Sequence, residues 1–284
     1  MILLTGAGGR TGKALLRALV ARGADVRAFI RNSEQADGLR ALGAADVAVG
    51  DMTDADSINR AVAGTDVVLH VGPPMHPQEL EITRTFVDAT KANGASRFIY
   101  YSVMYPILRD VRHHSLKLDA TEMIVNSGVT YSIIEPCRYM QHLDVIWPTV
   151  LETGIHSMPF NTEVQFAVVD LEDLAAATAM VATQPGHEFA SYELAGPQNL
   201  SQSDMAAIIS EVLGRPITAQ ALPLDVMAAR AAEKGASEDR VNQMRIMNSH
   251  YDHSGFRGNP NVLQWLLGRP ATKYKDFVIR LAAS

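Results

Sequence analysis

Short apolar runs alternate with amphipathic segments through the first half of the chain. The runs predict buried strands, at 2–4, 24–30, 47–51, 66–71, 97–102 and 131–136. The segments between them carry polar starts and glycine or asparagine stops, and predict helices at 13–21, 54–64, 78–93 and 114–126. Near-continuous apolar strands that alternate with helices indicate a parallel sheet covered on both faces.

The second half of the chain is less regular. The pattern predicts strands at 165–170, 191–196 and 216–222, and helices at 171–183 and 202–213. Residues 223–250 look helical, and 258–284 form a tail that ends in a helix. We therefore predict an α/β fold with a doubly wound parallel sheet (Rossmann) and a smaller C-terminal substrate-binding lobe. The Rossmann domain is expected to comprise 1–137 and 164–196, and the lobe 138–163 and 197–284.

A glycine motif, T-G-x-x-G-x-x-G, spans residues 5–12 between the first strand and the first helix. Glycines at such a turn let a pyrophosphate approach the helix N-terminus, where free N–H groups favour anions. The strand–turn–helix context predicts a dinucleotide site, with a turn that only packs as the alternative. The predicted cofactor contacts here are Thr5, Gly6, Gly9, Arg10, Thr11 and Gly12.

The second strand indicates which dinucleotide is bound. It ends in Phe29-Ile30 without the acid that usually bonds the ribose hydroxyls of NAD, and Arg31 follows at once. A guanidinium suits a ribose 2′-phosphate, so the sequence favours NADP(H) over NAD, unless Arg31 is a solvated loop charge. Asp51 and Met52 are predicted beside the adenine; the alternative is that Asp51 caps the following helix.

Other candidates lie at the carboxyl ends of strands, where ligands bind in parallel sheets. Val71, Gly72 and Pro136 are predicted cofactor contacts for this reason. Tyr139, Met140 and His142 follow Pro136 in what looks like a loop at the same edge.

Composition narrows the class of protein. The net charge of −6 over 284 residues argues against a nucleic-acid partner, and no apolar stretch is long enough to span a bilayer. The N-terminus is already a core strand, which leaves no room for a signal peptide. A single cysteine, Cys137, fits a reducing compartment, and no Cys/His cluster indicates a metal site. We therefore expect a cytoplasmic protein with a small-molecule partner; whether it forms a homodimer stays open.

The ordered set of motifs resembles the NmrA-like, or atypical, members of the short-chain dehydrogenase/reductase superfamily. The motifs are the glycine turn, Arg31, Gly50-Asp51, Tyr101-Ser102, His113/His114 with Lys117, Pro136 with Tyr139-Met140, Asp170-x-x-Asp173 and Leu213-Gly214-Arg215. The resemblance covers nearly the whole chain. It implies an NADP(H)-binding Rossmann protein, either a reductase of quinones, enones, dyes or phenolic compounds, or a redox sensor without turnover. It also places Tyr139, Met140 and His142 on the substrate side.

The chain departs from the superfamily at the catalytic residues. The usual motif is Tyr-x-x-x-Lys with an upstream serine; here it is His113-x-x-x-Lys117, with Ser102 at the strand end. The resemblance implies that Lys117 holds the nicotinamide ribose. His113 can replace the tyrosine as proton donor because imidazole titrates near neutral pH, and His114 and Tyr105 are competitors. The alternatives are a polar helix start with exposed imidazoles and a solvated lysine.

These residues favour an NADPH-dependent reductase that transfers hydride to a small quinone, enone or aromatic carbonyl compound. A quinone or enone needs a dedicated protein acid less than a ketone does. The main alternative is a non-catalytic NADP(H) sensor that regulates a partner protein. An epimerase or dehydratase of nucleotide sugars ranks last, since it needs the intact tyrosine–lysine pair.

Overall fold

The computed structural model describes all 284 residues and divides them into two compact units. Unit 1 comprises Met1–Ile107, His114–Pro136 and Leu174–Glu193. Unit 2 comprises Leu108–His113, Cys137–Asp173 and Leu194–Ser284. Residues 137–173 thus stay together in unit 2, whereas the predicted lobe left out 164–173. No helix has the length and apolar character needed to cross a membrane.

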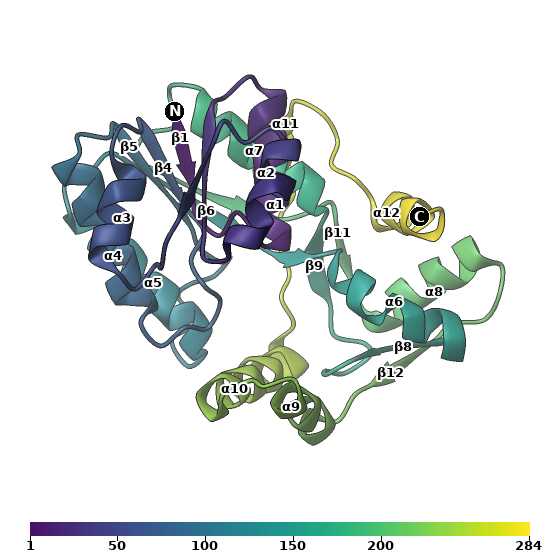
Figure 1. The fold of residues 1–284 in the computed structure, drawn as a ribbon. Coiled ribbons are helices and arrows are strands. Elements are labelled where there is room, and N and C mark those ends of the chain that lie inside the picture. Colours follow the sequence, from purple (N-terminus) through teal and green to yellow (C-terminus); the bar gives the residue numbers. More distant parts are fainter. The chain divides into compact units, whose positions relative to one another are not determined.

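A seven-stranded sheet forms the centre of unit 1, in the order β10-β6-β5-β4-β1-β2-β3 (Figure 1). Its strands are β1 (Ile2–Leu4), β2 (Val26–Ile30), β3 (Asp46–Val49), β4 (Val67–His70), β5 (Arg97–Tyr101), β6 (Tyr131–Pro136) and β10 (Ala190–Leu194). Every pair from β3 to β6 is parallel. The chain moves outward on both sides of the β1–β4 pair, so the carboxyl ends of β1 and β4 mark the crevice where such sheets bind ligands. The predicted Rossmann fold is confirmed.

Helices cover both faces of this sheet. They are α1 (Arg10–Ala21), α2 (Ala36–Ala41), α3 (Ala55–Val62), α4 (Glu79–Ala92), α5 (Arg112–Asn126) and α7 (Leu171–Thr183), with a 3₁₀ turn at Ser33–Gln35. Helices α3, α4 and α5 pack on one face, and α1 and α7 lie on the other (Figure 1). Arg22, just after α1, donates a hydrogen bond of 2.7 Å to the Thr183 hydroxyl at the end of α7.

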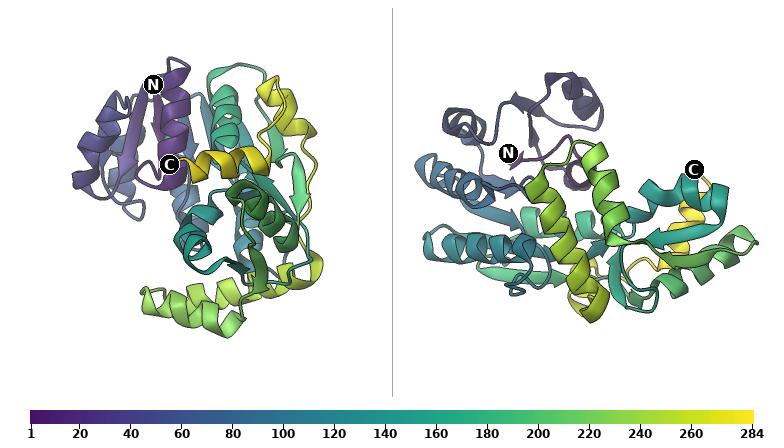
Figure 2. Two further views of the ribbon diagram at one scale, coloured as in Figure 1. Left: turned by 90° about the vertical axis from the view of Figure 1, so that its right-hand side faces the viewer. Right: turned by 90° about the horizontal axis from the view of Figure 1, so that it is seen from below.

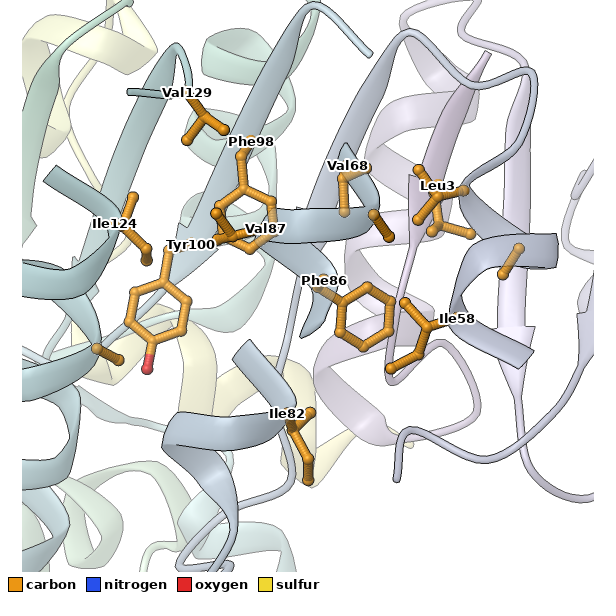
Figure 3. Packing of buried hydrophobic residues seen from close by; sticks show 14 of the residues in the cluster. Leu3, Ile58, Val68, Ile82, Phe86, Val87, Phe98, Tyr100, Ile124 and Val129 are labelled. Atoms are coloured by element: carbon orange, nitrogen blue, oxygen red, sulfur yellow. The ribbon is translucent and has the colours of Figure 1, made fainter. Parts of the chain in front are cut away.

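The core beneath α3, α4 and α5 is built from the apolar residues that the sequence pattern marked (Figure 3). Phe86, Phe98 and Tyr100 are fully buried in it, and burial of each such side chain contributes about 1.5–3 kcal/mol. The ring of His70 lies 4.5 Å from that of Phe86, so a polar side chain is enclosed within this aromatic cluster. The core therefore extends to the carboxyl end of β4.

Unit 2 holds two small sheets. One has the order β11-β9-β7, from Gln198–Leu200, Phe166–Val169 and Arg138–Tyr139. The other pairs β8 (Ile155–Met158) with β12 (Thr218–Ala221) in parallel. The helices are α6 (His142–Thr153), α8 (Gln202–Leu213), α9 (Leu224–Glu233), α10 (Glu238–Ser254), α11 (Asn261–Leu267) and α12 (Tyr274–Ala282). Figure 2 shows α9 and α10 side by side in yellow-green.

The helical character predicted for 223–250 is confirmed, in two helices, α9 and α10, with Gly235 between them at φ +83°. Two other details of this region differ from the sequence predictions. The loop expected after Pro136 contains strand β7, and His142 opens helix α6. The tail 258–284 contains α11 as well as the final helix.

Two buried carboxylates fasten the end of the chain within unit 2. Asp170 accepts hydrogen bonds from Gln141 at 2.7 Å and from Arg280 of α12 at 2.5 Å. The Gln141 side chain also accepts a hydrogen bond from the Leu171 N–H at 3.0 Å. Asp173 accepts from Arg269 at 2.6 Å. Since both carboxylates are at most 2% exposed, their partners in the last sixteen residues are structural.

Candidate functional site

The glycine turn has no room for side chains at Gly6 and Gly12. Gly6 has φ +63°, and a Cβ there would lie 2.9 Å from the Val71 carbonyl oxygen. A Cβ on Gly12 would lie 2.2 Å from the Gly6 carbonyl oxygen, which real structures do not tolerate. Gly9 forms the N-cap of α1, and no side chain caps the helix there. The first N–H groups of α1 can therefore be donated to an anion.

The Thr5 side chain ties β1 to β4. Its hydroxyl accepts from the Val71 N–H at 2.8 Å, donates to the Val71 carbonyl at 3.1 Å, and lies 3.1 Å from Nδ1 of His70. The Thr83 hydroxyl lies 3.4 Å from the other ring nitrogen of His70. Burial, with the charge of Lys117 added, lowers the pKa of His70 to about 3, so this imidazole is neutral. Thr5 is fully buried, and its side chain positions Val71 and Gly72 at the crevice.

Arg31 and Asp51 lie near one another, beyond the ends of the neighbouring strands β2 and β3. Both are exposed. Asp51 accepts hydrogen bonds from the N–H and the hydroxyl of Thr53, each at 2.8 Å, and these with the charge of Arg31 lower its pKa. Helix α3 is capped by Asp54, so the alternative that Asp51 is the cap is wrong. Met52 is partly buried and packs against the core of unit 1.

Lys117 has a buried partner that the sequence did not indicate. Its ammonium lies 2.5 Å from Oε1 of Glu79 and donates to the Tyr101 carbonyl at 3.1 Å. It also lies 4.9 Å from the centre of the Tyr100 ring. Glu79 is fully buried in the first turn of α4, and Lys117 is 5% exposed. The alternative of a solvated lysine is therefore wrong.

Tyr100 completes this cluster. Its hydroxyl donates to Oε1 of Glu79 at 3.1 Å, and burial together with the Glu79 charge holds its pKa well above the usual range. Tyr100 thus stays protonated. Acids in the first turn of a helix are common because they favour the helix dipole, so nothing in the sequence distinguished Glu79 from them.

Ser102 and the histidine pair lie at the carboxyl end of β5 and the start of α5. Ser102 is 5% exposed, and its Oγ has no hydrogen-bond partner although it is buried. His114 is fully buried, with Nδ1 2.9 Å from the Tyr105 carbonyl oxygen, so the alternative of exposed imidazoles is wrong for it. Tyr105 has φ +58°, an unusual backbone conformation for a tyrosine. His113 is partly buried and precedes Lys117 by one turn of α5.

Pro136 ends β6 and is buried in unit 1. Its carbonyl accepts a hydrogen bond of 2.9 Å from the Met104 N–H, which joins the segment after β6 to the segment after β5. Ser102 is joined to β6 in the same way, since its N–H donates to the Ile134 carbonyl at 2.7 Å. Ser102 and Pro136 therefore end neighbouring strands at one edge of the sheet.

The three predicted substrate residues, Tyr139, Met140 and His142, line one narrow cavity of about 20 Å³ in unit 2. We call it the Arg138 cavity, because Arg138 also lines it. The rings of Tyr139 and His142 are nearly parallel, at 12°, with their centres 5.7 Å apart. The remaining wall comes from β8, β9, α8 and α12 and includes His156, which the sequence analysis missed along with Arg138.

No three His, Cys, Asp or Glu side chains gather in a way that could hold a metal ion. The groups at the strand ends are instead N–H donors, an arginine, a lysine–carboxylate pair and a serine hydroxyl. Such a set is suited to binding a phosphate-containing ligand and to stabilising negative charge.

Similar proteins cover the whole length of this chain. It is 26% identical to the NAD(P)H azoreductase of Xenophilus azovorans, over 100% of this chain and 99% of that relative. It is 25% identical to quinone oxidoreductase 2 of Escherichia coli, over 99% and 98% of the two chains.

Solved structures agree with this. The Escherichia coli NADPH-dependent quinone oxidoreductase complexed with NADPH matches with a TM-score of 0.87 at 25% identity, over 99% of this chain and 100% of that one. The Citrobacter sp. triphenylmethane reductase complexed with NADP(H) matches with a TM-score of 0.85 at 22% identity, over 99% of each chain, which shows a shared fold. The model of the NmrA-like family matches residues 1–275. The chain belongs to the NmrA-like family, as its motifs predicted.

Proposed function

We propose that this protein is an NADP(H)-dependent reductase that transfers hydride to a quinone-like acceptor. The full-length similarity to a quinone oxidoreductase and an azoreductase supports the reaction class. The observation that carries the proposal is the glycine turn. A Cβ on Gly12 would lie 2.2 Å from the Gly6 carbonyl oxygen, so the position requires glycine, and the uncapped N-terminus of α1 suits a pyrophosphate. We assign the cofactor to unit 1.

Arg31 would bind the ribose 2′-phosphate of the cofactor. It is exposed at the end of β2, and no acid stands at that strand end to select NAD. Hydrogen bonds from Thr53, and to a smaller extent the charge of Arg31, lower the pKa of Asp51, so a carboxylate stands near Arg31 without an ion pair between them. The exposed arginine favours NADPH over NADH.

Lys117 would hold the nicotinamide ribose. An ammonium has three N–H donors, and two of them reach Glu79 and the Tyr101 carbonyl. The third can be donated to a ribose hydroxyl. Because Glu79 fixes the ammonium, Lys117 does not need to be ordered when the cofactor binds.

The reduced nicotinamide supplies the hydride when it is bound. Ser102 has a buried hydroxyl without a partner, and it can donate to the acceptor oxygen that gains charge. No tyrosine stands four residues before Lys117, so water, His113 or Tyr105 would supply the proton. A quinone tolerates this well, since its reduced oxygen can be protonated by solvent.

Turnover by the purified protein tests the proposal. NADPH oxidation would be followed with menadione, an azo dye, cyclohexenone and benzaldehyde as acceptors, with NADH in parallel. We expect the fastest turnover with menadione or the azo dye, and Lys117→Met should lower it strongly. The matched control is Lys234→Met, which removes an exposed lysine of unit 2. Tight NADPH binding without turnover of any acceptor would contradict the reductase and support a non-catalytic sensor.

A further inference from the structure

Arg138 in β7 is a cation without an anionic partner in unit 2. Its guanidinium lies 5.2 Å from the centre of the Phe160 ring and 5.8 Å from that of Phe166. Its hydrogen bond goes to the sulfur of Met158 at 3.8 Å. None of these partners carries negative charge, although Arg138 is partly buried and such arginines are normally paired with acids.

The titratable groups around Arg138 are also neutral near neutral pH. Burial raises the pKa of Tyr251 and of Tyr274 far above the usual range, so both stay protonated. Burial raises the pKa of the Cys137 thiol to about 12. Burial, with the charge of Arg138 added, lowers the pKa of His156 to about 4. Burial lowers the pKa of Arg138 itself only to about 10, so it stays charged. Arg138 makes no ion pair within unit 2, although the charge of Asp144 acts on the neighbouring Tyr274.

A second group points to the same place. His156 is 2% exposed, and its Nδ1 has no hydrogen-bond partner. A buried polar atom without a partner is costly and is commonly satisfied by a ligand or an ordered water. His156 and Arg138 line the same cavity, so a neutral ring nitrogen and a guanidinium face a common space.

The shape of the Arg138 cavity limits what can enter. Its volume of about 20 Å³ admits a small group, and its wall includes Met140 and the nearly parallel rings of Tyr139 and His142. Guanidinium groups match planar carboxylates in a two-pronged geometry. A carboxylate is the smaller and flatter of the common organic anions that an arginine pairs with. The flat side chains favour an aromatic body attached to it.

We infer that the Arg138 cavity binds the carboxylate of an aromatic substrate, with Arg138 as the cation that balances it and His156 as a further hydrogen-bond partner. The ligand's identity as the hydride acceptor rests on the proposed function. The binding site itself does not, because it is built entirely from unit 2 and can be measured without turnover.

Calorimetric binding of benzoate and benzamide tests this inference. The two ligands have nearly the same size, and only benzoate is charged. We expect the wild-type protein to bind benzoate at least about tenfold more tightly, as a charge-assisted pair requires. Equal affinities for the two ligands would overturn the inference.

Arg138→Met assigns the effect to the arginine. Methionine keeps an apolar side chain against the rings of Phe160 and Phe166, and we expect it to reduce benzoate affinity to that of benzamide. Arg230→Met, which removes an exposed arginine of α9, should change neither affinity. Arg138→Lys keeps the charge without the two-pronged geometry and should bind benzoate with intermediate affinity. This second variant keeps the inference testable if Arg138→Met fails to fold.

Two further measurements distinguish a failure of the inferred binding site from a failure of the proposed reductase function. NADPH affinity should be the same in Arg138→Met and wild type; a selective loss of NADPH binding would mean that Arg138 binds a cofactor phosphate, and would overturn the inference. The turnover ratio between a carboxylated quinone and its neutral parent should fall at least about tenfold in Arg138→Met. Selective benzoate binding without turnover of any acceptor would leave the site standing while the proposed reductase fails.

Discussion

Replacing Glu79 by glutamine would leave the ammonium of Lys117 buried without its counter-charge. The glutamine keeps the shape of the side chain and can still accept from the Tyr100 hydroxyl, but it loses the ion pair of 2.5 Å. Removing one partner of a buried pair costs about 3–5 kcal/mol. Lys117 keeps its bond to the Tyr101 carbonyl and its contact of 4.9 Å with the Tyr100 ring, so we expect the lower end, about 3 kcal/mol.

A double-mutant cycle measures this coupling. The free energy of unfolding would be obtained from urea titrations, followed by far-ultraviolet circular dichroism, for Glu79→Gln, Lys117→Met and the double variant. We expect each single variant to lose about 3 kcal/mol and the double variant to lose much less than their sum, because it buries no unpaired charge. Asp37→Asn breaks an exposed pair with Arg40 and serves as the control that should change little.

Two results would refute this reasoning. Losses below about 1 kcal/mol in both single variants would mean that the pair is solvated in solution and has no buried character. A double variant that loses the full sum would mean that Glu79 and Lys117 act independently. Lys117 would then be held by the Tyr101 carbonyl and the Tyr100 ring alone.

Three other predictions follow from the structure. Arg31→Ala should weaken NADPH binding about 10–100-fold and leave NADH binding unchanged, in fluorescence titrations; equal losses would remove the 2′-phosphate role. Gly12→Ala would place a Cβ 2.2 Å from the Gly6 carbonyl oxygen, so NADPH binding should be lost. Wild-type affinity in this variant would contradict the assignment of the glycine turn to the pyrophosphate. Burial and the charge of Glu193 raise the pKa of Glu135 to about 7 from 4.5, so the folded protein holds this proton more tightly than the unfolded chain. The stability that Glu135 contributes is complete below about pH 4.5 and is lost as the pH rises through about 7. In urea titrations, Glu135→Gln should remove this fall in the free energy of unfolding with pH, and above about pH 7 it should be more stable than wild type by up to about 3 kcal/mol. An unchanged pH dependence in the variant would argue against a buried carboxyl.

The sheet of unit 1 could be predicted from the sequence because local pattern and tertiary burial agree there. Strands β1, β3, β4 and β5 are mostly apolar, and each precedes a helix whose ends carry recognisable signals. Helix α6 could not be predicted in this way. Pro148 lies inside it and removes one of its hydrogen bonds, and prolines within a run normally argue against a helix. The neighbouring strand β7 is two residues long, too short for any periodicity to show.

A residue of the candidate site could be predicted from the sequence only where it occupies a position in a motif. Lys117, Ser102 and Arg31 stand at motif positions and could be named as candidates from the sequence, while their roles stay predictions. Glu79 is 38 positions before Lys117 in the chain and is indistinguishable from an ordinary first-turn acid until the fold brings the two together. Arg138 stands out only because it has no acidic partner. The partners of a side chain are known only from the folded unit, so the sequence could not indicate this residue.

The ion pair between Asp170 and Arg280 gives helix α12 a structural role within unit 2. Terminal residues are commonly the most tolerant of deletion, but removal of Arg280 would strip a buried carboxylate of its positive partner. Asp170 would then keep the Gln141 side chain and the Glu172 N–H as hydrogen-bond donors. Gln141 lies in the chain between Met140 and His142, which line the Arg138 cavity. A truncation that removes Arg280 is therefore expected to disturb the wall of the Arg138 cavity, which we infer binds substrate, even though it leaves every residue of the cavity in place.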